Sequence, residues 1–358
     1  MAEVKQAAKQ EKMATRQAYG KALVEIGAEN KNLVVMDADL SKSTMTAEFA
    51  KAYPERFFNM GIAEQNLYAA ACGLALSGKV VCASTFAMFA AGRAFEIIRN
   101  SIGYTHANVK ICATHAGITV GEDGASHQTF EDIALMRTIP GMVVVNPSDG
   151  ASAKALLKQV IEMDGPAYVR LGRAAVPVFY DEAAASELKL GKGSCLREGK
   201  DLTIIATGIM VSEAMIAASE LASKGIDARV IDMHTIKPLD EEIIVKAASE
   251  TGAIVTAEEL ASKGIDARVI DMHTIKPLDE EIIVKAASET GAIVTAEEHS
   301  VIGGLGSAVA EVVVKKCPVK MAMVGQQDTF GESGKPDELK AKYEMTAADI
   351  VRAAENLK

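Results

Sequence analysis

Large aromatic side chains are scarce in this sequence. Tryptophan is absent, and the aromatic residues make up only 4% of the chain. A hydrophobic core must therefore be built from Val, Ile, Leu, Ala and Met, and hydrophobic residues account for 49% of the 358 residues. With 24% charged residues, the composition is that of a globular protein rather than a disordered or fibrous one. At roughly 150 residues per domain, the length predicts two domains.

Basic clusters and long apolar runs are also missing. The 38 Lys and Arg residues are outnumbered by 48 Asp and Glu residues, which gives a net charge of -10. This balance argues against nucleic acid as a partner. No stretch reaches the roughly 18 apolar residues of a membrane helix, and residues 1–30 are charged throughout, unlike a signal peptide. We therefore expect a cytoplasmic protein.

The five cysteines form no recognisable framework. They are odd in number, widely spaced and without a C-x-x-C pair: Cys72, Cys82, Cys112, Cys195 and Cys317. Neither a set of disulfides nor a cysteine zinc site is indicated, so we expect reduced thiols that lie mostly in the core.

Short β-branched runs alternate with longer amphipathic segments, as in parallel strands joined by crossover helices. The predicted strands of the first half are Leu33–Met36, Arg56–Asn59, Lys79–Ala83, Val109–Ala113, Met142–Asn146 and Ala167–Leu171. The predicted helices between them are Arg16–Ala28, Ala63–Leu76, Gly92–Ile102, Glu131–Arg137 and Ala151–Glu162. In such sheets, ligands bind beyond the carboxyl ends of the strands.

The periodicity fades over residues 174–200, which we interpret as a linker. We therefore expect an α/β protein with two domains, residues 1–173 and 201–358. Each should be a mostly parallel sheet flanked by helices.

The second domain contains an exact tandem repeat. Residues 221–259 recur letter for letter as residues 260–298, a unit of 39 residues. Solenoid repeats vary in sequence and need about three units to bury a core, so a recent duplication or an assembly artefact is the better interpretation. We expect one copy to complete the domain and the other to be extruded or added at an edge. Two copies forming consecutive buried strands of one sheet would contradict this.

A carboxylate begins one of the predicted helices. In FFNMGIAEQN (57–66), a strand end turns into a helix with Glu64 in its first turn. The helix dipole favours the charged form of this carboxylate, whereas the apolar neighbours Phe58, Met60 and Ile62 oppose it. Glu64 could share a proton with a ligand nitrogen. Alternatively, it could cap its own helix.

Several long motifs occur in one order. MGIAEQN (60–66) is followed by STFAMF (84–89), THAGITVGEDGASH (114–127) and YVRLGR (168–173). Together they resemble the pyrimidine-binding domain of the transketolase family of thiamine diphosphate enzymes. EHSVIGGLGS (298–307) and FGES (330–333) resemble the C-terminal domain of that family. The resemblance covers nearly the whole chain except one repeat copy.

The resemblance implies cofactor-binding roles. It places Glu64 at N1′ of the aminopyrimidine ring of thiamine diphosphate, where protonation lets the 4′-amino group relay a proton. Phe86 and Phe89 would pack around this ring, with ordinary core packing as the alternative. Asp39 resembles an aspartate near the cofactor across a subunit boundary, whereas Asp37 could be only a turn residue at a strand end.

The same resemblance implies substrate-binding roles for the loop residues His115, Asp123 and His127, and catalytic roles for the two histidines. Their spacing fits no strong zinc pattern. The two histidines would face the ketose donor or its phosphate, where imidazole can donate hydrogen bonds and move protons. Asp123 would accept a hydrogen bond from a sugar hydroxyl. Ala116 departs from the acidic or amide residue usual in the family, which leaves the fine substrate preference open.

Four further residues are candidates for binding the acceptor phosphate: Arg16, Ser43, Arg170 and Arg173. The planar guanidinium fork suits an anion, and Arg173 aligns best with a phosphate ligand of the family. Arg170 could equally have an exposed, structural role.

Two weaker signals lie in the second half. Gly304-Leu-Gly306, with Asp328 further on, partly imitates a dinucleotide fingerprint, but Val309 replaces the third glycine, so close helix packing is the preferred interpretation. His234 and His273 are one residue seen twice through the repeat, and a structural role is expected for them. The role of His299 is left open.

The diphosphate anchor of the family is absent. That anchor is a Gly-Asp-Gly followed by Asn, which holds the divalent ion, and the nearest match here is Glu122-Asp123-Gly124 with Asn146. We therefore expect the C-terminal subunit of a split transketolase, inert alone. A separate subunit would carry Gly-Asp-Gly…Asn and bind the diphosphate with Mg²⁺ or Ca²⁺. With that partner, the chain would transfer a two-carbon ketol unit between sugar phosphates, in an assembly containing two copies of each chain.

Related activities stay open. They include 1-deoxyxylulose-5-phosphate synthesis, an apulose-phosphate transketolase and a 2-oxo-acid dehydrogenase β subunit, although the GEDGASH loop (121–127) favours a transketolase over the dehydrogenase. A non-catalytic assembly subunit is a further alternative. The repeat favours it, whereas the retained Glu64, His115, Asp123 and His127 argue against it.

Overall fold

The computed structural model describes residues 11–223, 225–238, 240–251, 254–255, 288, 292–302, 305–327, 329, 331–346, 348–349 and 352–353. They form two compact units, which we call the N-terminal unit (11–190 with Gly331–Gly334) and the C-terminal unit (the described residues of 191–330 and 335–358). The division between Leu190 and Gly191 falls inside the segment 174–200 that was interpreted as a linker. That segment nevertheless contains β8 (Ala175–Pro177), α8 (Glu182–Ser186) and β9 (Ser194–Arg197).

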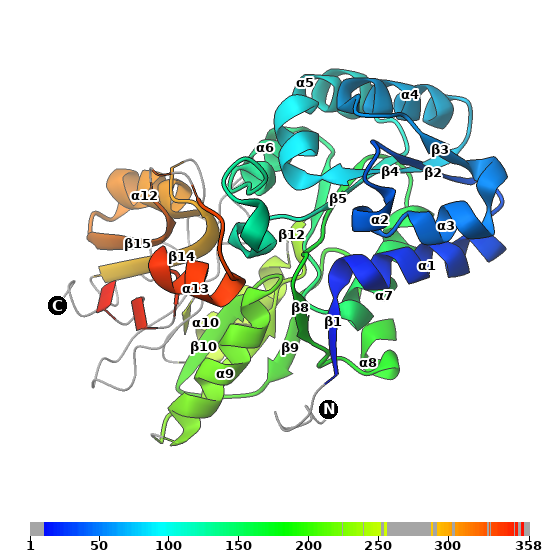
Figure 1. The fold of residues 1–358 in the computed structure, drawn as a ribbon. Coiled ribbons are helices and arrows are strands. Elements are labelled where there is room, and N and C mark those ends of the chain that lie inside the picture. Colours follow the sequence, from blue (N-terminus) through cyan, green and yellow to red (C-terminus); the bar gives the residue numbers. More distant parts are fainter. Residues whose placement is uncertain are drawn as a thin grey trace. The chain divides into compact units, whose positions relative to one another are not determined.

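The N-terminal unit is built on a parallel sheet (Figure 1). Six of its strands run in the order β6-β7-β5-β4-β2-β3, and every neighbouring pair is parallel. Their bounds are β2 (Leu33–Asp37), β3 (Phe57–Asn59), β4 (Val80–Phe86), β5 (Val109–Thr114), β6 (Val143–Val145) and β7 (Ala167–Arg170). Residues of β2, β5 and β7 are buried along their whole length, because helices cover both faces of the sheet. The predicted α/β fold class is confirmed.

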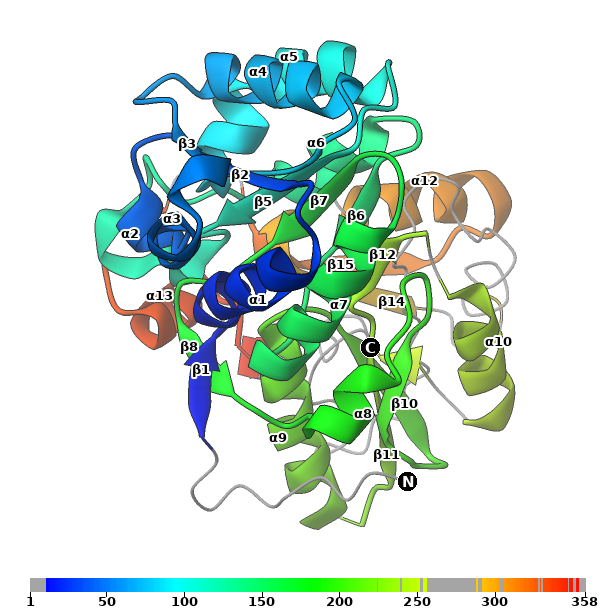
Figure 2. The ribbon, with the colours of Figure 1, turned by 90° about the vertical axis from the view of Figure 1, so that its right-hand side faces the viewer.

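Helices α1 (Thr15–Glu29) and α7 (Gly150–Glu162) lie on one side of this sheet, and α4 (Glu64–Leu76) lies on the other (Figures 1 and 2). An ion pair of 2.6 Å between Lys154 and Glu25 joins α7 to α1. Asp149 caps α7, because its carboxylate accepts a hydrogen bond from the Ser152 amide at 2.8 Å. Helix α7 is thus fixed at its N-terminal end as well as by its contact with α1.

The segment after β4 differs from the single helix predicted over Gly92–Ile102. It consists of the π-helical turn η2 (Phe89–Arg93), α5 (Phe95–Ile97) and a second π-helical turn, η3 (Ile98–Gly103). Such widened turns cannot be seen in an apolar periodicity, and they are frequent at functional sites.

Short elements complete the N-terminal unit. They are β1 (Lys12–Ala14), which pairs antiparallel with β8, and α2 (Ser41–Thr44), α3 (Ala47–Ala52), η1 (Pro54–Arg56), η4 (Ile118–Asp123) and α6 (Asp132–Thr138). Of these, only α6 was predicted, as the helix Glu131–Arg137.

A buried ion pair lies between α6 and β7. Asp132 accepts hydrogen bonds from Arg170 Nε at 2.8 Å and from the Tyr168 hydroxyl at 2.7 Å. All three side chains are buried. The alternative that gave Arg170 an exposed, structural role is therefore wrong about its exposure, since the buried guanidinium compensates the buried carboxylate. Binding of a phosphate by Arg170 stays a prediction.

The C-terminal unit contains a four-stranded sheet in the order β13-β10-β11-β9. Strand β10 (Leu202–Ala206) runs parallel to β11 (Ala228–Asp232) and β13 (Ile254–Val255), whereas β9 is antiparallel to β11. The other elements of the unit are α9 (Met210–Ser223), β12 (Thr235–Lys237), α10 (Glu241–Glu250), α12 (Leu305–Lys316) and α13 (Pro336–Lys342), together with the parallel pair β14 (Ala292–Ser300) and β15 (Lys320–Gln326).

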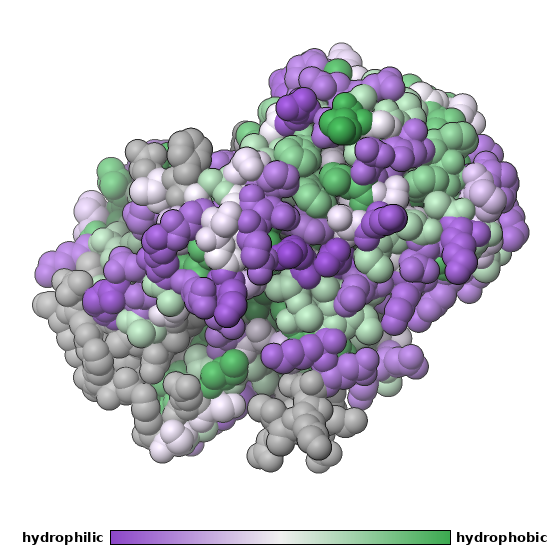
Figure 3. Space-filling model, viewed as in Figure 1, coloured by the Kyte–Doolittle hydropathy of each residue, from purple (hydrophilic) through white to green (hydrophobic). Residues whose placement is uncertain are grey.

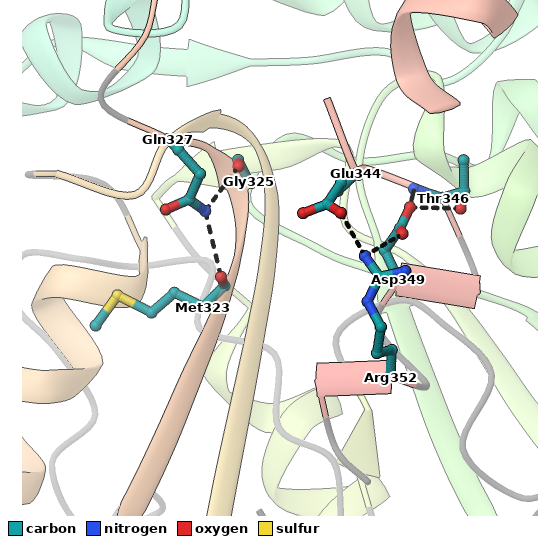
Figure 4. A network of polar contacts seen from close by, with 7 residues as sticks. All are labelled: Met323, Gly325, Gln327, Glu344, Thr346, Asp349 and Arg352. Carbon is teal, nitrogen blue, oxygen red and sulfur yellow. Dashed lines mark hydrogen bonds and ion pairs between the residues drawn. The ribbon is translucent and has the colours of Figure 1, made fainter. Parts of the chain in front are cut away.

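Near the end of the chain, Arg352 links the last described residues (Figure 4). Its guanidinium contacts Glu344 and Asp349, each at 2.8 Å, and Asp349 also accepts a hydrogen bond from the Thr346 hydroxyl at 2.6 Å.

The two repeat copies provide strands to different sheets. The first copy supplies β11, β12, α10 and β13, and β13 pairs with β10. The second copy supplies residues 292–298 of β14, which pairs with β15. Within the described part of the chain, the copies therefore do not form consecutive strands of one sheet. Most of the second copy lies outside the described residues, so extrusion of one copy stays a prediction.

Three of the cysteines, Cys72, Cys82 and Cys112, are buried, whereas Cys195 is exposed and Cys317 is half-buried. Polar residues cover much of the face shown in Figure 3, with smaller apolar areas between them. Among the helices that the structure describes, none combines the length and apolar character needed to cross a bilayer.

Candidate active site

The candidate site lies at the carboxyl ends of the parallel strands in the N-terminal unit. Asp37, the last residue of β2, is fully buried and accepts hydrogen bonds from the Leu40 amide at 2.6 Å and from the Thr44 and Thr46 hydroxyls at 2.6 and 2.9 Å. Burial raises the pKa of this carboxyl, although these hydrogen bonds oppose the shift. Asp37 thus organises the turn after β2, in keeping with its interpretation as a turn residue.

Glu64 is the first residue of α4, and its carboxylate is almost entirely removed from solvent. The residue is 3% exposed, and its Oε2 has no hydrogen-bond partner among the described residues. Arg93 of η2 places its Nε 3.8 Å from that oxygen. Ala63 occupies the N-cap position of α4, and no side chain caps this helix end. The alternative that Glu64 caps its own helix is therefore not supported by the described hydrogen bonds, and the buried Oε2 is available for a ligand proton.

Four rings gather beyond β4 and β5. The Phe86 ring stacks on the His115 imidazole, with centroids 3.9 Å apart and planes at 24°. Phe89 stacks on Phe86 at 6.0 Å, and the His127 ring meets Phe89 edge-on at 5.4 Å. Two aromatic and two imidazole residues predicted for the cofactor and the substrate are thus brought together in one cluster.

His115 is held in an unusual conformation. It follows β5 with a backbone φ of +58°, a left-handed value that is uncommon for residues other than glycine and that concentrates at functional sites. The Thr114 hydroxyl lies 2.9 Å from its Nδ1. Burial, followed by the nearby charges of Arg16, Arg173 and His127, lowers the pKa of His115 to about 3. The imidazole is therefore neutral at physiological pH.

We expect the His115 imidazole to remain uncharged from pH 8 down to about pH 4. The unfolded chain takes up this proton near pH 6.5, whereas the folded chain does so only near pH 3. Stability contributed by the neutral ring is thus fully present above pH 6.5 and is lost as the pH falls toward 3. Imidazole ¹⁵N shifts, assigned by comparison with His115→Asn, measure this directly. An inflection for His115 between pH 6 and 7 would contradict it.

Two arginines lie close to the loop that connects β5 to α6. Arg173 donates a hydrogen bond to the Val120 carbonyl at 2.7 Å and forms an ion pair with Glu122. Arg16 donates to the Ser43 carbonyl at 2.6 Å, while its Nε is buried without a hydrogen-bond partner among the residues described. Burial and the neighbouring Arg173 lower the pKa of Arg16, and Asp123 partly offsets this effect. Two adjacent guanidinium groups make the region attractive to an anion.

The exposed residue Asp39 lies in a separate arrangement. Its backbone φ is +63°, and its carboxylate accepts a hydrogen bond from Asn59 Nδ2 at 3.2 Å. The described contacts link it to the end of β3 and not to the ring cluster. Its predicted position across a subunit boundary stays a prediction.

Three contacts near the site were not predicted from the sequence: the Thr114 hydroxyl with His115, Arg93 with Glu64, and the amide of Gln128, the residue after His127, with the Ile118 carbonyl. Thr114 and Gln128 are direct neighbours of predicted histidines, so their adjacency was the available signal. Arg93 becomes a neighbour of Glu64 only through the fold. Among the described residues, no group of three His, Cys, Asp or Glu side chains could hold a metal ion.

The secondary candidates of the C-terminal unit have ordinary surroundings. His234 is fully buried with its Nδ1 2.9 Å from the Thr235 hydroxyl, and burial lowers its pKa to about 4. A structural role is consistent with this. His273, Gly304 and Asp328 lie outside the described residues, as does the side chain of His299.

Comparison with known families divides the chain as the structure does. Residues 11–178 match the family described as the transketolase pyrimidine-binding domain. Residues 191–260 and 255–350 match the family described as the transketolase C-terminal domain. The two segments of the second match overlap within the repeat, so the family pattern is interrupted there.

Individual proteins are similar along nearly the full length. The chain is 46% identical over 338 residues to a putative transketolase C-terminal section of Methanocaldococcus jannaschii, covering 94% of each chain. It is 39% identical to a 6-deoxy-6-sulfo-D-fructose transketolase subunit of a Clostridium species, covering 95% of this chain and 92% of the relative. A solved structure described as a split gene transketolase, inactive beta4 tetramer, is 51% identical and covers 96% of this chain and 98% of that chain, with a TM-score of 0.72.

Proposed function

The chain belongs to the transketolase family, and from this premise we propose that it is the C-terminal subunit of a split, thiamine diphosphate-dependent transketolase. With a separate diphosphate-binding subunit, it transfers a two-carbon ketol unit from a ketose phosphate to an aldose phosphate. The observation that carries the proposal is the buried Oε2 of Glu64, which has no hydrogen-bond partner among the described residues, in a unit that matches the pyrimidine-binding domain.

The residues present fit the pyrimidine half of thiamine diphosphate. A buried carboxylate oxygen without a hydrogen-bond partner suits a ring nitrogen that shares a proton, and flat aromatic side chains suit a heteroaromatic ring. Glu64 would hold the ring nitrogen, with Phe86 and Phe89 beside the ring. When bound, the cofactor supplies the nucleophilic carbon and the electron sink for the transfer.

The other residues would bind and orient the sugar. His115 is neutral, so it can donate or accept a hydrogen bond at a substrate hydroxyl without bringing a charge into the site. His127 and Asp123, on the same loop, would contact the donor, and Asp123 would accept a hydroxyl proton in a hydrogen bond. Arg16 and Arg173, with Ser43 beside Arg16, would bind the terminal anion.

The partner subunit would carry Gly-Asp-Gly…Asn and hold Mg²⁺ or Ca²⁺ on the diphosphate. We propose an assembly of two copies of each chain. The similarity to a structure described as an inactive beta4 tetramer of a split gene transketolase supports a chain that associates with itself and depends on a partner for activity.

The identity of the sugar is not fixed by these residues. One relative is described as a 6-deoxy-6-sulfo-D-fructose transketolase subunit, and two guanidinium groups would bind a sulfonate as well as a phosphate. Apulose phosphate is a further candidate donor, and deoxyxylulose synthesis would require decarboxylation of pyruvate.

Reconstitution tests the proposal. The chain is purified alone and together with a candidate partner subunit that carries Gly-Asp-Gly…Asn. Both samples are assayed with thiamine diphosphate, Mg²⁺, xylulose 5-phosphate and ribose 5-phosphate, and then with 6-deoxy-6-sulfofructose as the donor. We expect the pair to catalyse ketol transfer and the isolated chain to show none. Turnover by the isolated chain, or release of CO₂ from pyruvate by the pair, would contradict the proposed function.

A further inference from the structure

A segment from far along the sequence joins the N-terminal unit. Gly331–Gly334 groups with this unit, although residues on both sides belong to the other one. Its contacts are with the loop that carries Asp123 and His127. The Gly334 amide donates to the Gly121 carbonyl at 3.4 Å, and the Glu332 carbonyl accepts a hydrogen bond from Gln128 Nε2 at 3.0 Å.

Gln128 connects both ends of that loop to the segment. Its Nε2 also donates to the Ile118 carbonyl at 3.3 Å, so a single amide group bridges two backbone carbonyls. The residue is only 3% exposed. A buried amide that donates twice fixes the distance between the segments that it joins, because releasing it would leave buried polar groups without partners.

Glycines allow this close approach. A Cβ atom on Gly331 would lie 1.8 Å from Gln128 Oε1, a distance that no packing can accommodate without movement. A Cβ atom on Gly124, which has a φ of +76°, would lie 2.6 Å from Ser333 Oγ. The segment and the loop therefore meet at positions without side chains, on both sides of the contact.

The Gln128 amide lies next to His127 in the chain, and the loop that it closes contains Asp123. Few other backbone hydrogen bonds are described for this loop. They include those from the Gly124 amide to Gly121 and from the His127 amide to Gly124, at 3.1 and 3.0 Å, which are local. Local turns set the shape of the loop, and two sets of tertiary contacts hold its position. One is the contact with Gly331–Gly334, and the other joins Arg173 to the Val120 carbonyl and to Glu122.

We propose that Gln128 is a positioning residue, which ties the loop of Asp123 and His127 to Gly331–Gly334 and so holds both side chains where the sugar donor binds. This inference rests on the proposed function of the loop. It assigns a role at the site to a segment from the C-terminal part of the sequence. Misplacement of these side chains by about 1 Å is enough to weaken their contacts with the donor sugar considerably.

Gln128→Glu tests the role, because the isosteric carboxylate puts an oxygen in place of the donor that faces two carbonyls. In the reconstituted enzyme we expect KM for the donor sugar to rise about tenfold or more, with kcat changed less than about threefold. Hydrogen exchange of residues 118–128 in the full chain should become faster. Gln159→Glu is the matched control, since its amide donates to the Leu188 carbonyl at 2.7 Å elsewhere in the unit, and should leave KM unchanged.

Gly331→Ala tests the same contact from the other side and should act in the same direction. Gly73→Ala in α4, where an added Cβ meets nothing within 4 Å, is its control. Unchanged exchange in Gln128→Glu, or faster exchange with an unchanged KM, would overturn the proposal. If the wild-type pair shows no ketol transfer, the proposed function fails. Hydrogen exchange of residues 118–128 would still decide whether Gln128 holds this loop in place.

Discussion

Replacing Glu64 by Gln is expected to lower kcat of the reconstituted enzyme by a factor of about 10² to 10⁴, the range typical of a lost proton-transfer group. The amide has the same shape as the carboxylic acid, but it cannot exchange a proton with the pyrimidine nitrogen. Glu64 is buried, and its Oε2 has no hydrogen-bond partner among the described residues, with Arg93 Nε 3.8 Å away. The substitution therefore removes a carboxylate oxygen that no described hydrogen bond occupies. Steady-state ketol transfer with saturating cofactor gives the measurement.

A second carboxylate in a first helical turn supplies the control. Glu48 is exposed and lies in the first turn of α3, away from the ring cluster. Glu48→Gln therefore removes a comparable interaction of a carboxylate with a helix dipole without changing the site. It should retain wild-type activity. If Glu64→Gln stays within threefold of the wild type, Glu64 has only a structural role, and the assignment of the proton relay is wrong.

The strands of the N-terminal unit could be predicted because parallel strands buried on both faces are continuous runs of Val, Ile, Ala and Cys. Predicted and observed bounds of β2, β5 and β7 differ by one residue at most. The three-residue strands β1 and β8 are too short for any periodicity. The π-helical turns η2 and η3 have the composition of an ordinary helix, and only the backbone geometry distinguishes them.

The candidate site was accessible from the sequence to the extent that its residues are close along the chain or belong to long motifs. The ring cluster of Phe86, Phe89, His115 and His127 follows from motifs that end neighbouring strands. By contrast, the pairing of Arg170 with Asp132 and the contact of Gln128 with Gly331–Gly334 join distant segments. No local pattern encodes such contacts, because they are set by tertiary packing.

Removing one repeat copy is expected to stabilise the C-terminal unit. The copies are identical, so deleting residues 221–259 or 260–298 produces the same chain. Among the strands that the structure describes, β13 and β14 lie at the edges of separate sheets. Ile254 pairs with Thr203 of β10, and Ile293, its counterpart in the second copy, pairs with Met321 of β15. A single strand has two edges, and the shortened chain would let one copy pair with both β10 and β15.

Joining the two sheets would make the pair β14–β15 part of a larger parallel sheet. This should stabilise the unit, because an isolated pair of strands is only marginally stable. If two or three backbone hydrogen bonds are gained, at about 1 kcal/mol each, the melting temperature should rise by roughly 5–10 °C. Calorimetry on both chains measures this rise, and hydrogen exchange should show slower exchange of the remaining Ala-Ile-Val-Thr strand. An unchanged or lower melting temperature would mean that the second copy supplies stabilising structure of its own, and that the sheets are not one sheet divided by the duplication.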